Sequence, residues 1–145
     1  MNETELRPYV DPTAAPFTAS ILEMLNAPFC VANGYRPQVI ALDRVVLSKH
    51  VGPADRNSNG FAHGGCIYSL MDHAFAILTN LDKHAVGQSS YLNFFRPGRG
   101  DELEAEARFI NVSKSISTVE VRVTGDGKLL AVGTFNAFNL QEIHK

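Results

Sequence analysis

Two adjacent glycines and a nearby carboxylate are the residues in this chain that could carry chemistry. Gly64 and Gly65 directly precede a long apolar run, so they are expected at the N-terminus of a helix. A helix N-terminus presents unpaired N–H groups and a positive dipole end, and glycine lets a carbonyl oxygen or other substrate group approach the backbone. Such a site stabilises negative charge that develops on a carbonyl oxygen. The alternative is that the glycines only make the turn.

Asp72 is expected in the middle of the same helix, among apolar neighbours. An ionised carboxylate there has a desolvation cost unless its face opens on water or on a charged site. It could act as a nucleophile that forms an anhydride, or as a general base on water, and the sequence leaves both open. The structural alternative is a carboxylate satisfied by the hydroxyl of Ser69.

The order Asn57, His63-Gly64-Gly65, Asp72 resembles a family motif. It is similar to that of the hot-dog fold thioesterases, in particular the phenylacetate-pathway (PaaI-like) acyl-CoA thioesterases. A second segment, Phe94-Phe95-Arg96-Pro97-Gly98, resembles the family's Phe-Leu-Arg-Pro-Gly. The likeness covers roughly residues 35–140 and predicts a hot-dog fold.

The resemblance implies a role for each matching residue. Asp72 matches the catalytic carboxylate, the Gly64 N–H matches the oxyanion donor, and Asn57 matches a residue near the scissile bond. A hydroxyl on the next strand often places water in the family, and three adjacent residues remain candidates here: Gln88, Ser89 and Ser90. The implied substrate is an acyl-CoA, with water as co-substrate and no bound cofactor.

Helix geometry places Gly64 and Asp72 about 12 Å apart along the helix axis within one chain. Both groups must come within about 3 Å of one reacting centre. The site is therefore expected to join Gly64 of one subunit to Asp72 of its partner, and the resemblance implies the same sharing.

Other polar residues near these motifs have simpler interpretations. His63 could be a general acid, but a hydrogen bond within its own loop, shaping the oxyanion site, is favoured. His73 is expected at an interface or in the core, and Cys66 as an inert buried thiol. Arg96 and Arg99 could meet the phosphates of coenzyme A, although loop cations are usually only solvated.

The elements that must position these residues define an α+β fold. Residues 65–81 predict one long helix, apolar nearly all round, which has to be buried on most sides. Residues 38–51 predict one strand, because they are rich in β-branched residues and lack glycine and proline. Four further strands are predicted as a meander joined by hairpins, one of them at Pro97-Gly98-Arg99-Gly100: 87–96, 102–112, 116–124 and 129–140.

The predicted architecture is an antiparallel sheet of about five strands wrapped around one helix, in a single domain over residues 31–145. Residues 1–30 are expected to form a leader, irregular over 1–16, with a short helix whose capping box is Ser20 to Glu23. One sheet wrapped on one helix leaves an edge strand and a helix face uncovered. A homodimer would cover them, and two such dimers could pair into a tetramer.

Composition excludes several classes. Hydrophobic residues make up 45% and charged residues 19% of 145, and the net charge of -2 gives no electrostatic footprint for nucleic acid or an anionic membrane. The acidic start contains no apolar run of signal-peptide length, so a cytoplasmic location is expected. Two cysteines predict no disulfide, and the five histidines lack metal-ligand spacing, so no metal is expected.

Two other functions remain open at this point. A non-catalytic acyl-CoA binding module would retain ligand without turnover. A hot-dog hydratase or dehydratase would act on acyl thioesters, but the dehydratases that the chain resembles place a catalytic His and Glu in a different motif.

Overall fold

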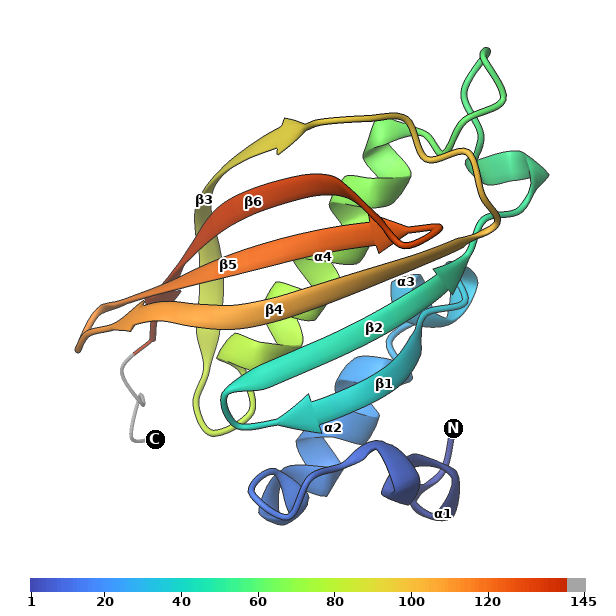
Figure 1. Ribbon diagram of the computed structural model, residues 1–145. Coiled ribbons are helices and arrows are strands. Elements are labelled where there is room, and N and C mark those ends of the chain that lie inside the picture. The colour runs from blue at the N-terminus through green and yellow to red at the C-terminus, as the bar shows by residue number, and fades with distance from the viewer. Residues whose placement is uncertain (141–145) are drawn as a thin grey trace.

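The computed structural model describes residues 1–140, and its main features are a curved antiparallel sheet and a long helix packed across it (Figure 1). Six strands lie in the order β1-β2-β4-β5-β6-β3. The strands are β1 (Arg36–Ala41), β2 (Arg44–His50), β3 (Ala85–Phe94), β4 (Glu102–Val112), β5 (Ile116–Gly125) and β6 (Lys128–Asn139), and the α-helices are α1 (Glu3–Leu6), α2 (Thr18–Leu25), α3 (Pro28–Ala32) and α4 (Gly64–Thr79). The predicted hot-dog architecture is confirmed.

Helix α4 carries its apolar residues around most of its circumference, as the sequence predicts. Ile67, Leu70, Met71, Ala74 and Leu78 recur every three or four residues and are almost fully buried. Burying each of the larger aliphatic side chains stabilises the fold by about 1.5–3 kcal/mol. The uncovered positions lie on one stripe of the helix: Gly65 and Asp72 are exposed, and Tyr68, Ser69 and Ala76 are half-buried.

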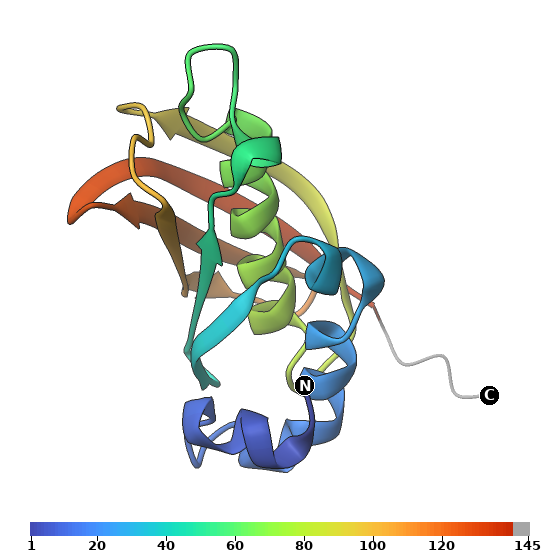
Figure 2. The ribbon, with the colours of Figure 1, turned by 90° about the vertical axis from the view of Figure 1, so that its right-hand side faces the viewer.

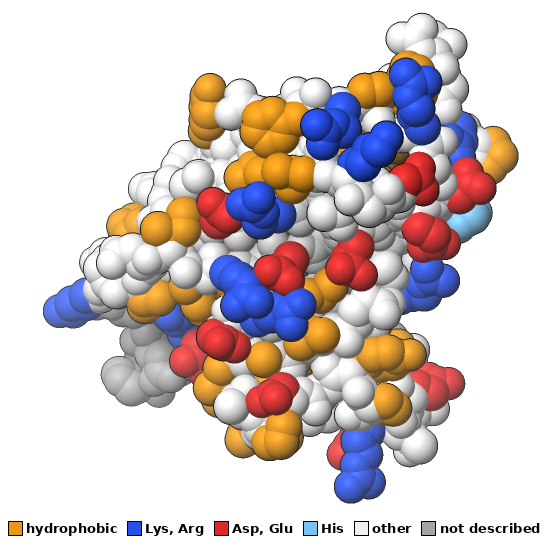
Figure 3. All heavy atoms as spheres, viewed as in Figure 1, with side chains coloured by type: hydrophobic (Ala, Val, Ile, Leu, Met, Phe, Trp, Pro, Cys, Tyr) orange, Lys and Arg blue, Asp and Glu red, His pale blue; other side chains and the backbone are white. Residues whose placement is uncertain are grey.

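Strands β4 and β5 show the alternation that predicts them. Leu103, Ala105 and Ala107 face the core, as do Val119 and Val121, while the charged residues between them face outward. On the outer face Arg44 and Arg108 both pair with Glu106, and Figure 3 shows basic and acidic side chains interleaved across the middle of this surface. The outer face of the sheet centre is therefore a charged, solvated surface.

The prediction of one strand over 38–51 is wrong, because the chain reverses at Leu42–Asp43 to make the β1–β2 hairpin. Ala41 pairs with Arg44 on either side of this two-residue turn. The turn contains neither glycine nor proline, so a prediction from β propensity alone continues the strand across it. The sheet consequently has one more strand than expected.

The predicted hairpin at residues 97–100 is also wrong. Strand β3 pairs with β6, while β4 pairs with β2 and β5, so the link from β3 to β4 crosses from one part of the sheet to another. The link is held by the loop before α4, where Ala62 N–H donates to the Gly98 carbonyl at 2.9 Å. Turn residues such as Pro97 and Gly98 predict that the chain changes direction, but they do not predict which strand the following strand pairs with.

The leader is more ordered than expected. Residues 3–17 form α1 and two 3₁₀ turns, and Leu6 and Ala14 are fully buried in the same core as Ile40. The predicted capping box at Ser20 is wrong, because α2 already begins at Thr18.

Figure 2 shows α4 between the sheet and the short helices α2 and α3. Ile21 and Leu25 of α2 and Cys30 of α3 belong to the main core. These helices therefore cover part of the α4 face that the sheet leaves open. Cys30 and Cys66 are free thiols.

No helix within residues 1–140 is long and apolar enough to cross a membrane.

Candidate active site

The loop from Gly52 to His63 delivers the chain to α4 and fixes the helix N-terminus. His63 is the N-cap residue, and its Nδ1 accepts a hydrogen bond from the Gly65 N–H at 2.8 Å. This bond places the proton of a neutral His63 ring on Nε2. The N–H of Gly64 makes no hydrogen bond to any atom of residues 1–140. It is therefore a free donor at the positive end of a sixteen-residue helix.

Gly64 borders a groove of about 330 Å³, the Gly64 groove, together with Asn57, Phe94 and Arg96. The Asn57 side-chain oxygen accepts hydrogen bonds from the N–H groups of Asn59 and Phe61 at 3.0 and 3.1 Å. Within the described residues, the hydrogen bonds of the Asn57 side chain use only its amide oxygen. The Asn57 amide nitrogen remains a donor at the groove.

Basic side chains gather over this end of the molecule in Figure 3. Arg96 donates from Nη1 to the Leu129 carbonyl at 2.8 Å, and the Arg99 guanidinium lies 4.6 Å from the centre of the Phe61 ring. These contacts hold both cations near the Gly64 groove while leaving further N–H donors on each guanidinium.

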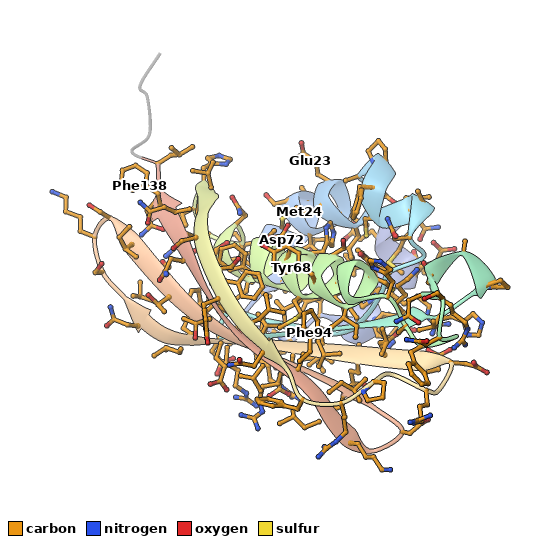
Figure 4. All side chains as sticks on the ribbon, turned by 90° about the horizontal axis from the view of Figure 1, so that it is seen from above. Glu23, Met24, Tyr68, Asp72, Phe94 and Phe138 are labelled. Carbon is orange, nitrogen blue, oxygen red and sulfur yellow. The ribbon has the colours of Figure 1, made fainter. Side chains whose placement is uncertain are left out.

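Asp72 lies in a different groove of about 400 Å³, the Asp72 groove, which Tyr68, Phe75, Gln88 and Ser90 also line. Figure 4 shows Tyr68 and Asp72 together on α4, with Phe94 apart from them. Asp72 is exposed as a residue, but the groove walls shield part of its carboxyl from water; this desolvation raises the pKa of the carboxyl, and the neighbouring His73 partly opposes that rise.

The structural alternative for Asp72 is not observed, because the Ser69 hydroxyl donates to the Gly65 carbonyl at 2.8 Å instead. In the described residues no hydrogen bond reaches the Asp72 carboxylate, and the side chain is exposed in the single protomer. The carboxylate is free to contact a ligand.

Strand register separates the three candidates on β3. Ser90 pairs with Phe135, which is buried against α4, so Ser90 faces the helix and Asp72. Ser89 pairs with Asn136 and accepts a hydrogen bond from its amide at 3.1 Å, on the opposite face of the sheet. Gln88 is the extra residue at a register shift in β3.

Two residues of this region escaped the sequence analysis. Tyr68 lies one helical turn before Asp72, and its hydroxyl is 2.8 Å from that of Ser90. Its spacing of four residues from Asp72 on one helix is the sequence signal that could have indicated Tyr68. Lys49 follows the inward positions Val45 and Leu47 at the strand period, so its ammonium enters the core next to the Gly52–His63 loop.

The histidines make no metal cluster in the part of the chain that the structure describes, and His144 lies outside it. His73 packs beside Tyr35 with ring centres 5.3 Å apart, and burial lowers the pKa of its imidazole. Burial raises the pKa of the Cys66 thiol, which disfavours a thiolate nucleophile.

The Gly64 groove and the Asp72 groove share no lining residue. Along α4 their two key residues are about 12 Å apart. Strand β3 borders both, with Ala85 and residues 87–90 on the Asp72 groove and Phe94 on the Gly64 groove. The chain therefore carries two separate grooves along one edge strand.

Comparison with known proteins shows the family of this chain. The model of the Thioesterase superfamily matches residues 59–132, just over half of the chain, and this stretch contains Gly64, Asp72 and β3. The chain belongs to the Thioesterase superfamily. A Deinococcus radiodurans protein that is provisionally named an esterase is 43% identical over 94 residues, which span 63% of this chain and 63% of that protein.

Solved structures support the same family. A mutant of the phenylacetic acid degradation protein PaaI from Thermus thermophilus is 37% identical, with a TM-score of 0.75, and the match covers 78% of this chain and 99% of that one. The PaaI protein of E. coli, 23% identical, matches in fold with a TM-score of 0.81 over 89% of this chain and 94% of its own.

A third structure is that of a Streptococcus pneumoniae hypothetical thioesterase with coenzyme A. It is 23% identical, with a TM-score of 0.69 over 73% of this chain and 85% of its own. The resemblance to PaaI-like hot-dog thioesterases is confirmed, and the family supports thioester hydrolysis as the general chemistry of this fold.

Proposed function

We propose that this protein is an acyl-CoA thioesterase that hydrolyses its substrate to a free acid and coenzyme A in a site shared by two protomers. The observation that carries the proposal is the pairing of a free Gly64 N–H at a helix N-terminus with a hydrogen-bond-free Asp72 carboxylate in a separate groove. Acyl transfer from a thioester needs an oxyanion donor and a nucleophile or base.

The Gly64 N–H stabilises the negative charge that forms on the carbonyl oxygen, assisted by the α4 dipole. The Asp72 carboxylate either attacks the carbonyl carbon or removes a proton from the attacking water. In the first route an anhydride forms and water then cleaves it; in the second the acid forms directly. In both, the carbon–sulfur bond breaks, the CoA sulfur leaves as a thiolate, and its proton comes from solvent.

Strand β3 supplies a way to bring the two half-sites together. It is an edge strand whose outer side has no partner within residues 1–140, and Tyr91 in its middle is 72% exposed. Antiparallel pairing of β3 with β3 of a second copy would set its first half against the second half of the partner strand. That arrangement places the Asp72 groove of one protomer beside the Gly64 groove of the other.

The two grooves divide the substrate between them. The Asp72 groove has aromatic walls, Phe75 and Phe135, that suit an acyl group. Arg96 and Arg99 beside the Gly64 groove can pair with the phosphates of coenzyme A, the ligand present in the Streptococcus pneumoniae structure. Asn57, which lines the Gly64 groove, lies beside the proposed position of the thioester, and Gly65 follows the oxyanion donor in α4.

The test is a panel of aryl-acetyl, benzoyl and medium-chain acyl-CoAs, assayed for released thiol. Wild-type protein should turn over at least one of them, and Asp72→Ala should lower kcat by at least about a hundredfold while the circular dichroism spectrum stays native. Asp43→Ala, in the turn of the β1–β2 hairpin, is the matched control and should keep wild-type activity. Binding without turnover would show a binding module, and a change in the acyl chain without thiol release would show a hydratase or dehydratase.

A further inference from the structure

Lys49, the penultimate residue of β2, has a charged side chain, yet only 4% of the residue is exposed. Its ammonium donates to the Asn33 carbonyl at 2.7 Å and lies 3.1 Å from the Asp55 carboxylate. The Tyr35 ring covers it, with the ring centre 5.9 Å from Nζ. A lysine is almost never buried this deeply unless its charge is paired.

Asp55 links this buried charge to the residues around Gly64. Its carboxylate accepts a hydrogen bond from the Gly52 N–H at 2.9 Å, and its backbone carbonyl accepts one from the His63 N–H at 2.8 Å. Burial opposes ionisation of Asp55, but Gly52 and Lys49 outweigh it and lower the pKa of the carboxyl. The ion pair therefore connects β2 to the N-cap residue of α4.

The direction of the Gly64 N–H depends on the same N-cap. Gly64 lies between His63, held by Asp55, and Gly65, held by the His63 ring at 2.8 Å. An oxyanion donor must stay within a few tenths of an ångström of its place, and small displacements far from the reacting atoms reduce rates strongly. The backbone around Gly64 has to be fixed from outside the groove.

We propose that the buried Lys49–Asp55 ion pair is a positioning device that sets the direction of the Gly64 N–H through the backbone of Asp55 and His63. The inference rests on the proposed function, because it assigns the pair to the oxyanion half of that site. Lys49 and Asp55 touch neither groove. Their effect is on the rate of the chemical step and not on substrate contacts.

A stability role can be separated from a positioning role. Replacing both members of a buried ion pair by neutral side chains is often neutral or stabilising, whereas removing one member leaves an unpaired charge. Lys49→Met with Asp55→Asn removes both charges, and the Asn oxygen can still accept the Gly52 N–H. This double variant should unfold close to the wild-type temperature but leave the backbone of Asp55 less restrained.

The experiment measures kcat and KM for the best acyl-CoA substrate together with the unfolding temperature. In the double variant kcat should fall about tenfold to a hundredfold, with KM changed by less than about threefold. Gly64→Pro protein lacks the N–H, so adding the same two substitutions to it should lower kcat by no more than about twofold relative to Gly64→Pro alone. Arg36→Met, which removes the exposed pair with Glu102, is the control and should keep wild-type kcat.

Two results would overturn the positioning role. One is a wild-type kcat in the folded double variant, and the other is a fall in kcat on adding the two substitutions to Gly64→Pro protein that is as large as the fall in wild-type protein. If the double variant does not fold, Lys49→Met alone carries the same two expectations, because the carboxylate that it leaves unpaired, that of Asp55, is only partly buried and still accepts the Gly52 N–H. A wild-type protein that releases no thiol overturns the proposed function itself. Full activity in the Lys49 and Asp55 variants, with Asp72→Ala inactive, overturns only this inference.

Discussion

The hydroxyl oxygens of Tyr68 and Ser90 lie 2.8 Å apart and join α4 to the edge strand β3. Tyr68 is held from behind by the Phe135 ring, with ring centres 5.7 Å apart. Tyr68 lies one turn from Asp72, and both line one groove with Ser90, so the bond fixes a hydroxyl in the same groove as the carboxylate. Of the hydroxyls of Ser89 and Ser90, only that of Ser90 faces Asp72 and is anchored to the helix.

Substitution of the two β3 serines should therefore give unequal results. Ser90→Ala removes the hydroxyl that faces Asp72 and should lower kcat about tenfold or more. Ser89→Ala changes a side chain bonded to Asn136 on the other face and should stay within about twofold of wild type. Steady-state thiol release measures both, and equal losses would contradict the assignment. Tyr68→Phe should add nothing to Ser90→Ala if Tyr68 acts through that hydroxyl.

The pH dependence of kcat/KM should show the raised pKa of Asp72. A base or nucleophile works only when ionised, so activity should fall with decreasing pH through a pKa above the ordinary aspartate value of about 3.9. The measurement is a pH–rate profile with circular dichroism at each pH. An acid limb at or below the ordinary value would remove Asp72 from this role.

The same raised pKa has a consequence for stability. The folded protein holds the Asp72 proton more tightly than the unfolded chain, so this residue's contribution is present below the unfolded pKa and is lost as pH rises through the folded pKa. Asp72→Asn should therefore unfold at a higher temperature than wild type at pH 7, and the difference should vanish below about pH 4. Thermal scans at the two pH values test it.

The hot-dog architecture was predictable because its main signals are local. The apolar run of α4 and the alternation in β4 and β5 follow directly from the order of residues. The β1–β2 turn at Leu42–Asp43 was missed because it uses neither glycine nor proline.

The sequence predicts Gly64 and Asp72, but other features of the site depend on strand register and tertiary contacts that local sequence patterns do not show. The register shift at Gln88 decides which serine faces α4, since one extra residue moves the following side chains to the other face of the sheet. Lys49 was missed because its partners, Asn33 and Asp55, belong to segments that only the tertiary fold brings to it.

Removal of the Gly64 N–H is a direct test of the oxyanion donor. Proline fits this position: it is the first residue of α4, where proline is favoured, and His63 before it has ψ 141, as a residue preceding proline prefers. Because the N–H has no partner within residues 1–140, Gly64→Pro loses no internal hydrogen bond.

We expect Gly64→Pro to fold and to lose about 3 kcal/mol of transition-state stabilisation, or more than a hundredfold in kcat. Gly64→Ala keeps the N–H, and its Cβ would lie 3.4 Å from the Phe94 ring, so it should lose much less. Unchanged activity in a correctly folded proline variant would exclude Gly64 as the donor.

Complementation between inactive variants tests the shared site. Asp72→Asn protein lacks the carboxylate and Gly64→Pro protein lacks the N–H, so each homodimer should be inactive. In a mixed dimer, one site combines the intact Gly64 of the first protomer with the intact Asp72 of the second, and the other site lacks both. Random pairing makes about half of the dimers mixed, each with one working site of two, so activity should recover to roughly a quarter of wild type. Co-refolding followed by native mass spectrometry measures the fraction of mixed dimers beside the released thiol. Mixed dimers without recovered activity would mean that the two half-sites do not meet across the dimer, and β3 pairing would no longer explain how they act together.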